Sequence, residues 1–395
     1  MIAHIFRIIS VFLACVSGLA LFPFRADAYT PSGQLEIHYI NIGQGGSTLI
    51  IGPNGTRILY DFGNVGRGSA IASYLNDAVG LKPSEGIHYT IVSHRDQDHY
   101  GGFAQVIDAG YDIKVANYDS GSKKPASNRM NDVWLDKAAQ TTAGAVTPIS
   151  VGMRIPLGEG AEVRVIAANG KIFEYTEKLP FARNENDRSI SLYIKYRNFD
   201  YILDGDIGAG AEKCTAHQTS QKDFQVPIAK ALMRLGWMSP KTGVDVLHIA
   251  HHGSESSTSA KYYNLMKPEV GLVSVGKNQG TFRHPRVDVV EKILLTEGEE
   301  RAGCVKAPPL KALFQTDGGL AGTSSTGATS FAGKIIGDIK LVTNGVSNYR
   351  ISGSGHVEHQ TFTENPEGGS WCFPLDEVAN EVQGTCAITL TQGRD

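Results

Sequence analysis

The segment 93–102, with the sequence SHRDQDHYGG, holds four potential metal ligands within six residues: His94, Asp96, Asp98 and His99. It follows the apolar run 88–93, which is typical of a β-strand, so these side chains sit in a loop where they can converge on one point. Imidazole and carboxylate groups bind Zn²⁺ and Mn²⁺ well. A polar surface turn with a capping aspartate is the alternative, although His-x-Asp-x-Asp-His is a rare string. The segment therefore predicts a metal centre.

Three more histidines lie at the ends of predicted elements. His251 and His252 follow the apolar run 244–250, and either one can act as a general acid if it points toward the metals. Which of the two points inward is left open, and a purely structural histidine pair is the alternative. His284 precedes Pro285, so it is either a ligand or a turn residue.

Cationic side chains surround His284. They are Lys277, Arg283 and Arg286. Guanidinium and ammonium groups beside metal ions favour the binding of phosphate oxygens. A solvated surface is the alternative for this cluster.

The elements that must position these residues are mixed along the chain. Short strands are predicted at 35–42, 47–51, 57–61, 88–93, 162–167, 189–196, 201–203 and 244–250. Helical spacing occurs at 68–80, 102–110, 261–266 and 287–295. This mixture predicts a layered α/β domain over about 33–300. A Gly/Ala/Ser/Thr-rich loop at 318–333 and a hairpin around Asn344-Gly345 would complete the domain within 301–360.

Length and composition exclude several classes of protein. The chain has 395 residues, of which 41% are hydrophobic and 19% are charged, and its net charge is -3. These values exclude a disordered chain and a strongly basic nucleic-acid binder. No protein partner can be inferred from the sequence.

The N-terminus has the features of an export signal. Residues 1–28 combine Arg7, an apolar stretch and an Ala-Asp-Ala cleavage site before Tyr29. The expected protein is therefore periplasmic or secreted, without a membrane anchor after cleavage. The expected mature chain keeps Cys214, Cys304, Cys372 and Cys386, which permit two disulfides; Cys372–Cys386, in the tail 361–395, is the first expected pair.

The motifs together resemble a known superfamily. His-x-Asp-x-Asp-His-x-Gly-Gly after a strand is similar to the signature of metallo-β-lactamase-fold hydrolases. The string ILYDFG, with Asp61, resembles their early Asp-x-Gly, and YILDGD, with Asp206, resembles the Gly-Asp whose aspartate bridges the metals. Four further strings resemble the extracytoplasmic hydrolase domain of ComEC-type DNA-uptake competence proteins: NDRSISL, DVLHIAHHGS, SVGKN and RHP. The resemblance covers roughly 35–300, and the membrane channel of that family has no counterpart.

This resemblance implies a four-layer αββα sandwich, with residues 29–300 as the hydrolase domain, that binds two divalent metal ions. The implied ligands are His94, Asp96, Asp98, His99, Asp206 and His284. Asp204 is an alternative to Asp206, and Asp61, Asn186 and Ser189 would support the ligands through hydrogen bonds.

The chain departs from the superfamily pattern at two points. Asp96 stands where most members have histidine, and Asn186-Asp187 occupies the region of the mid-chain histidine ligand. An oxygen-rich site favours Mn²⁺ over Zn²⁺ and disfavours β-lactam hydrolysis.

The expected activity is metal-dependent hydrolysis of phosphodiester bonds, with extracellular DNA as one candidate substrate. Asp98 would bind metal and orient the attacking water, and His252 or His251 would protonate the leaving oxygen. A hydrolase of another ester class, such as a lactone or a phosphocholine ester, is the first alternative. A non-catalytic binding protein with a degenerate metal site is the second.

Overall fold

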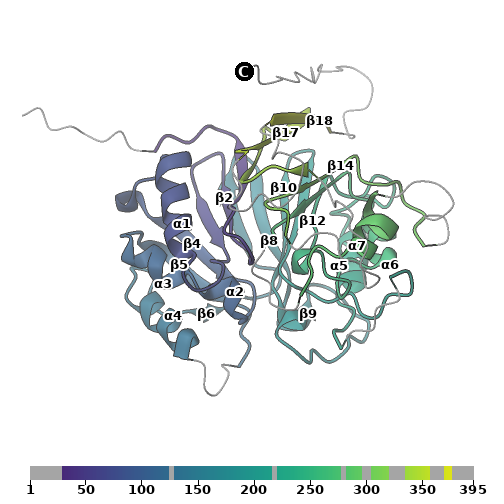
Figure 1. The fold of residues 1–395 in the computed structure, drawn as a ribbon, viewed down its shortest axis with the longest axis horizontal. Helices are drawn as coiled ribbons and strands as arrows, with labels where there is room; N and C mark the ends of the chain where they lie inside the picture. Colours follow the sequence, from purple (N-terminus) through teal and green to yellow (C-terminus); the bar gives the residue numbers. More distant parts are fainter. Residues whose placement is uncertain are drawn as a thin grey trace, which may run out of the picture.

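The computed structural model describes residues 29–123, 129–215, 220–276, 282–295, 304–319, 334–355 and 369–375. Within them the chain forms two large β-sheets that face each other, with helices on both outer sides (Figure 1). The expected four-layer αββα architecture is confirmed.

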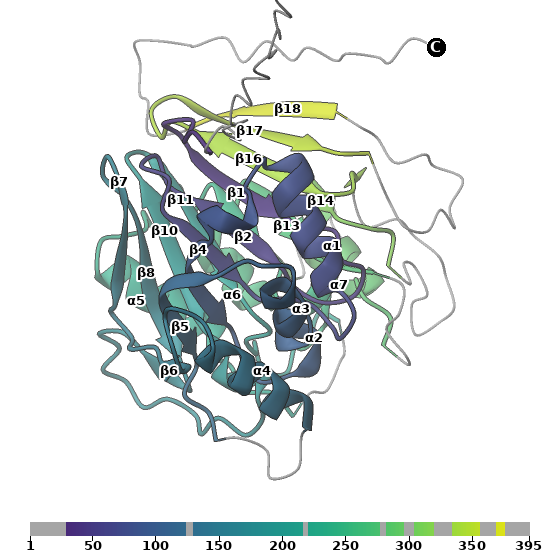
Figure 2. The ribbon, with the colours of Figure 1, turned by 90° about the vertical axis from the view of Figure 1, so that its left-hand side faces the viewer.

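The first sheet contains nine strands in the order β18-β17-β16-β1-β2-β3-β4-β5-β6. Its N-terminal strands are β1 (Leu35–Tyr39), β2 (Thr48–Ile51), β3 (Arg57–Tyr60), β4 (Ile87–Val92), β5 (Ile113–Asp119) and β6 (Thr147–Pro148). Its C-terminal strands are β16 (Ile339–Thr343), β17 (Asn348–Gly353) and β18 (Gly369–Pro374). β16 pairs antiparallel with β1, so the end of the chain completes the first sheet (Figure 2).

The second sheet runs in the order β15-β14-β13-β12-β11-β10-β8-β7, with β9 paired to β8. Its strands are β7 (Arg154–Gly158), β8 (Ala161–Ala168), β9 (Lys171–Ile172), β10 (Ser191–Tyr196), β11 (Phe199–Asp204), β12 (Val246–His248), β13 (Val270–Val273), β14 (Ala312–Gln315) and β15 (Lys334–Ile335). β11, β12, β13 and β14 are parallel neighbours, so their carboxyl ends meet at one edge.

Apolar side chains fill the space between the sheets because alternate residues of each strand point inward. Ile37 of β1, Ile58 of β3, Leu192 of β10 and Leu272 of β13 all belong to this inner core, and none of them is exposed. The inner core thereby fixes the two sheets against each other.

Helices cover the outer face of each sheet. The first sheet is covered by α1 (Gly68–Ser73), η1 (Tyr74–Ala78), α3 (Phe103–Asp108) and α4 (Arg129–Ala139). The second is covered by α5 (Gln225–Arg234), α6 (Ala260–Met266), α7 (Val287–Val289) and η5 (Val290–Leu295). The remaining short segments are η2 (Pro83–Glu85), α2 (Gln97–Tyr100), η3 (Asn186–Arg188) and η4 (His251–Gly253).

A disulfide joins Cys214 to Cys304 across 90 residues of sequence. Cys386 lies outside the described residues, as do the expected export signal and most of the Gly/Ser-rich loop. No helix in the described part of the chain has both the length and the apolar character that a bilayer crossing requires.

Candidate metal centre

The candidate site lies where strands of the two sheets end on the same side of the molecule. Asp61 directly follows β3, and the segment 93–99 directly follows β4. From the second sheet, Asp206 follows β11, and η4, with His251 and His252, follows β12. Because β3 and β4 are parallel, as are β11 and β12, the two pairs of strand ends bring their loops together.

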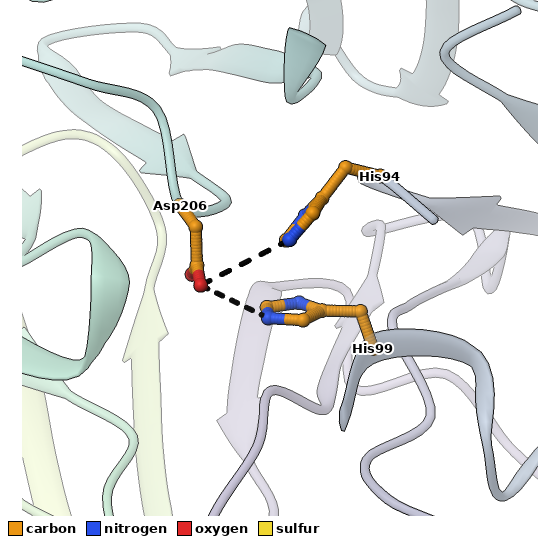
Figure 3. Close-up of side chains that lie close together, drawn as sticks. All are labelled: His94, His99 and Asp206. Carbon is orange, nitrogen blue, oxygen red and sulfur yellow. Dashed lines mark ion pairs between the residues drawn. The ribbon is translucent and has the colours of Figure 1, made fainter. Parts of the chain in front are cut away.

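His94, His99 and Asp206 form the centre of this cluster, and Figure 3 shows both imidazoles directed at the carboxylate. Asp206 Oδ2 lies 3.3 Å from His99 Nε2 and 3.9 Å from His94 Nε2. All three residues are buried, and one ligand atom from each lies within 4.8 Å of the others. This spacing is compact enough for these three residues to take part in a metal centre.

A second group of potential ligands adjoins the first and shares His99. It consists of Asp98, His99 and His252, whose ligand atoms also lie within 4.8 Å of one another. His252 Nε2 is 3.5 Å from Asp98 Oδ2 and 3.9 Å from Asp206 Oδ2. The Asp98 side chain is 29% exposed, whereas the His252 side chain is buried. Asp98 is therefore the member of this group that is open to solvent.

The buried donor atoms of the cluster fit a metal ion. The Nε2 atoms of His94, His99 and His252, together with Oδ1 of Asp206, have no hydrogen-bond partner among the described residues. A buried polar atom without a partner is costly, and imidazole nitrogen and carboxylate oxygen are ordinary metal ligands. The donor set therefore fits a metal ion, which would give each of these atoms a partner.

Hydrogen bonds behind the ligands hold their rings in place. Asp61 Oδ2 accepts from His99 Nδ1 at 2.8 Å and from Ser93 Oγ at 2.8 Å. Asp61 Oδ1 accepts from the Ser93 amide at 2.6 Å. On the other side, His252 Nδ1 lies 2.7 Å from the carbonyl oxygen of Ser274. These contacts leave Nε2 of both rings facing the cluster.

Both adjacent histidines of η4 face the site, although only one needed to do so. His251 Nε2 lies 3.6 Å from Asp206 Oδ2 and 3.3 Å from Asn186 Nδ2. Its Nδ1 lies 2.7 Å from Ser256 Oγ. Both histidines have positive φ, 53° for His251 and 55° for His252. This left-handed backbone lets consecutive side chains point toward the same centre.

Ser189 and Asp204 hold the loop that carries Asp206. Ser189 Oγ accepts from the Asp206 amide at 3.1 Å. The carboxylate of Asp204 instead accepts hydrogen bonds from the hydroxyl groups of Tyr262 and Ser191. Asp206, and not Asp204, is therefore the aspartate that reaches the histidines. Burial raises the pKa of Asp204 to about 6.

Two further candidate ligands lie at the margin of the cluster. Asp96 Oδ2 is 3.4 Å from His94 Nε2, and its side chain is 45% exposed. The His284 ring is centred 5.3 Å from His251 and 6.1 Å from His252. Neither Asp96 nor His284 belongs to the two compact groups.

The three candidate cations have different surroundings. Arg283 is exposed, whereas the Arg286 Nε pairs at 2.5 Å with Glu255, whose side chain is 5% exposed. Lys277 lies outside the described residues. Arg283 is thus the exposed cation beside His284 in the described structure.

Arg95 is a residue that the sequence did not single out. Its Nε and Nη2 lie 2.9 and 2.5 Å from Asp119 Oδ2, and its guanidinium lies over the ring of Trp134. The Arg95 amide also donates to Glu185, which accepts from Ser122. The middle residue of the His-x-Asp motif therefore anchors the ligand loop to β5. Two features of the sequence could have indicated this ion pair: Arg95 lies inside the ligand motif, and Asp119 lies at the end of a later strand.

The electrostatics of the cluster favour positive charge at His99 and His252. Burial lowers the pKa of His99, but Asp206, Asp61 and Asp98 outweigh burial and hold that pKa well above its usual value. Burial also lowers the pKa of His252, and Asp206 and Asp98 more than reverse the effect. By contrast, burial and the neighbouring His251 and His252 lower the pKa of His284 to about 2. The carboxylates thus create a field that stabilises a cation at their centre.

Two curated proteins are similar to this chain. Recombination protein 2 of Haemophilus influenzae is 24% identical over 287 residues, which cover 71% of this chain and 29% of that protein. ComE operon protein 3 of Bacillus subtilis is 22% identical over 276 residues, which cover 66% of this chain and 30% of that protein. The matches thus span about three-tenths of the length of these relatives. They confirm the resemblance to ComEC-type proteins that the motifs indicate.

Solved structures with similar folds include metallo-β-lactamase SMB-1, with a TM-score of 0.32, 17% identity and coverage of 58% of this chain and 84% of that one. Tm1679, described as a metal-dependent hydrolase of the β-lactamase superfamily, gives a TM-score of 0.34 and 13% identity, with coverage of 60% and 87%. No family model matches the chain.

Proposed function

We propose that this chain is an exported metal-dependent hydrolase that cleaves phosphodiester bonds with two divalent ions. The observation that carries the proposal is the pair of adjacent ligand groups, whose three histidines all have Nε2 within 3.9 Å of Asp206 Oδ2. Two such groups side by side suit the two-ion arrangement used for in-line displacement at phosphorus. Similarity to ComEC-type proteins supports the phosphodiester as the substrate class.

The residues would divide into two ligand sets around the shared carboxylate of Asp206. His94 and Asp96 would hold the first ion, and Asp98, His99 and His252 would hold the second. When bound, the two ions would supply Lewis acidity and activate a water molecule as the nucleophile. The oxygen-rich first set favours Mn²⁺ at that position.

Protein side chains would carry the proton transfers. Asp98 is the solvent-open carboxylate of the cluster, so its oxygens are available to orient the attacking water and accept its proton. His251 is held by Ser256 through Nδ1, and its Nε2 faces the site, which suits it to protonate the departing oxygen. His252 is the better ligand of the two because its Nε2 completes the second group.

The test is turnover by the full chain after chelation and reloading with Mn²⁺ or Zn²⁺. The substrate panel is bis-p-nitrophenyl phosphate, single-stranded DNA, a lactone and a cephalosporin. The proposal expects metal-dependent cleavage of the two phosphodiesters and little turnover of the others. An Asp206→Ala variant, which removes the shared carboxylate, controls for contaminating hydrolases. Turnover of the lactone without turnover of either phosphodiester would contradict the proposal.

A further inference from the structure

Two phenylalanines are exposed on the surface of the described chain. Phe181 is 80% exposed and Phe282 is 63% exposed, whereas the other phenylalanine, tyrosine and tryptophan side chains in the described ranges are buried or partly buried. Burying a phenyl ring is favourable, so a ring left in water is a candidate contact for a ligand. Both residues lie on loops that lead directly into the candidate site.

Phe282 is the more informative of the two because its ring continues a row of rings from the metal centre. Its ring is centred 5.8 Å from that of His284, with an angle of 26° between the two planes. The His284 ring in turn is centred 5.3 Å from that of His251, which faces Asp206. A planar group resting on Phe282 would therefore lie beside the reacting centre.

Each exposed ring is accompanied by an exposed cation. Arg283 follows Phe282 directly, and Arg183 lies two residues after Phe181; both arginines are exposed. The loop of Phe181 is tied to the site, since the Arg183 amide donates to Asp187 and Asn186 contacts His251. Aromatic rings interleaved with cations are the feature that binds single-stranded nucleic acid, whose unstacked bases present flat faces next to phosphates.

Other occupants fit this combination less well. A small apolar ester has no use for the arginines, and a duplex keeps its bases stacked internally and away from a surface ring.

We propose that Phe282 is a base-stacking platform for a single-stranded nucleic acid, with Arg283 holding an adjacent phosphate, so that the scissile bond next to the stacked base reaches the metal centre. The inference rests on the proposed phosphodiesterase function and narrows its substrate class.

The test compares two single-stranded substrates with the same phosphates. One is a thymidine oligonucleotide, and the other is an oligonucleotide of equal length built from abasic tetrahydrofuran residues. Phe282→Ala should raise KM for the thymidine substrate by about tenfold or more, the scale of one base–aromatic stack, with little change in kcat. It should leave the kinetics on the abasic substrate unchanged. Phe282→Trp should restore the low KM because indole also stacks.

Val346→Ala is the control. Val346 is 45% exposed and lies in the β16–β17 turn. Its carbonyl oxygen accepts from Asn198, which precedes β11, whereas Asp206 follows the opposite end of that strand. Equal effects of Phe282→Ala on both oligonucleotides, or no effect on either, would overturn the stacking role while leaving the phosphodiesterase function standing. The stacking role would also be overturned, and the phosphodiesterase function would stand, if the wild-type chain cleaved bis-p-nitrophenyl phosphate but preferred the abasic oligonucleotide. Failure to cleave any phosphodiester would overturn both proposals.

Discussion

The Nδ1 atom of His99 lies 2.8 Å from Oδ2 of Asp61, and this contact joins the ends of two parallel strands of the first sheet. Asp61 has a φ of 62°, so its backbone is in the left-handed region that asparagine and aspartate tolerate best. The same carboxylate also holds Ser93, directly before the ligand loop. One side chain thereby sets the direction of the imidazole that both ligand groups share.

Asp61→Asn should weaken metal binding while leaving the fold intact. Asparagine keeps the backbone conformation and one acceptor, but its amide nitrogen cannot accept the proton of His99 Nδ1. We expect metal affinity to fall by about 10–100-fold, the usual effect of losing a partner behind a metal-bound histidine. Isothermal titration with Mn²⁺ and Zn²⁺ measures the change, and circular dichroism checks the fold. Unchanged affinity would show that His99 does not need this partner.

Asp98→Ala should abolish hydrolysis in a folded protein. The change removes both the solvent-open carboxylate and one ligand of the second group. Turnover should fall by roughly 10²-fold or more, which is the scale of losing a major base or electrostatic contribution. Elemental analysis should show partial metal loss. Near-normal turnover at full occupancy would refute the assigned role.

The arginines around His284 should respond differently to substitution. Arg283→Ala should raise KM for DNA and flatten its dependence on salt, because an exposed cation that neutralises phosphate releases counterions. Arg286→Ala should instead lower the melting temperature, since it leaves the buried carboxylate of Glu255 without its ion pair. A salt series of turnover and a thermal melt for each variant separate the two effects. Equal salt slopes for wild type and Arg283→Ala would contradict the phosphate contact.

Stability should fall as pH rises because of Asp245. Burial, followed by the nearby Asp200 carboxylate, raises the pKa of Asp245 to about 8. The folded state therefore holds a proton that the unfolded chain releases near pH 4. The stabilisation is complete below that value and is lost as pH rises toward 8. Asp245→Asn, which stays neutral, should show a smaller fall in melting temperature between pH 5 and 9. Asp108→Asn, at an exposed ion pair, is the control and should follow wild type.

Removal of the Cys214–Cys304 disulfide should destabilise the chain. The bridge closes a loop of 90 residues, and losing such a native disulfide typically costs about 2–5 kcal/mol. The Cys214→Ser, Cys304→Ser double variant should unfold at lower denaturant concentration. Because neither cysteine is in the ligand groups, the metal stoichiometry of the folded variant should be unchanged. An identical denaturation midpoint would contradict this expectation.

Some elements could be predicted from local pattern and others could not. Strand β1 was predictable because Leu35, Ile37 and Tyr39 alternate with polar residues. Strands β4 and β11 were predictable because each is mostly apolar and aromatic and leads directly into a ligand motif. The helix α5 contains Pro227, which suggests a break but is tolerated in the first turn, where its missing amide proton has no partner to lose. The strand β5 has a mixed pattern of apolar and polar residues because part of it is exposed, so the sequence alone did not indicate a strand there.

The candidate site was predictable where its ligands are close in sequence. His94, Asp98 and His99 lie within one short loop, and their types alone indicate metal binding. The orientation of His251 and His252 was not predictable, since it depends on a left-handed backbone and on Ser256 and Ser274. The pairing of Arg286 with Glu255 likewise depends on packing between residues 31 apart.

The division of the ligands between the two sheets has a consequence for folding. His94 and His99 come from the first sheet and Asp206 from the second, with more than a hundred residues between them. Ions held between these histidines and Asp206 would cross-link the two halves of the sandwich, and such a site exists only in the folded state. Metal binding should therefore add directly to the free energy of unfolding, in proportion to the logarithm of the free ion concentration. The chain would be least stable before it meets its metal, so the compartment that supplies the ion would also govern how long the folded protein survives.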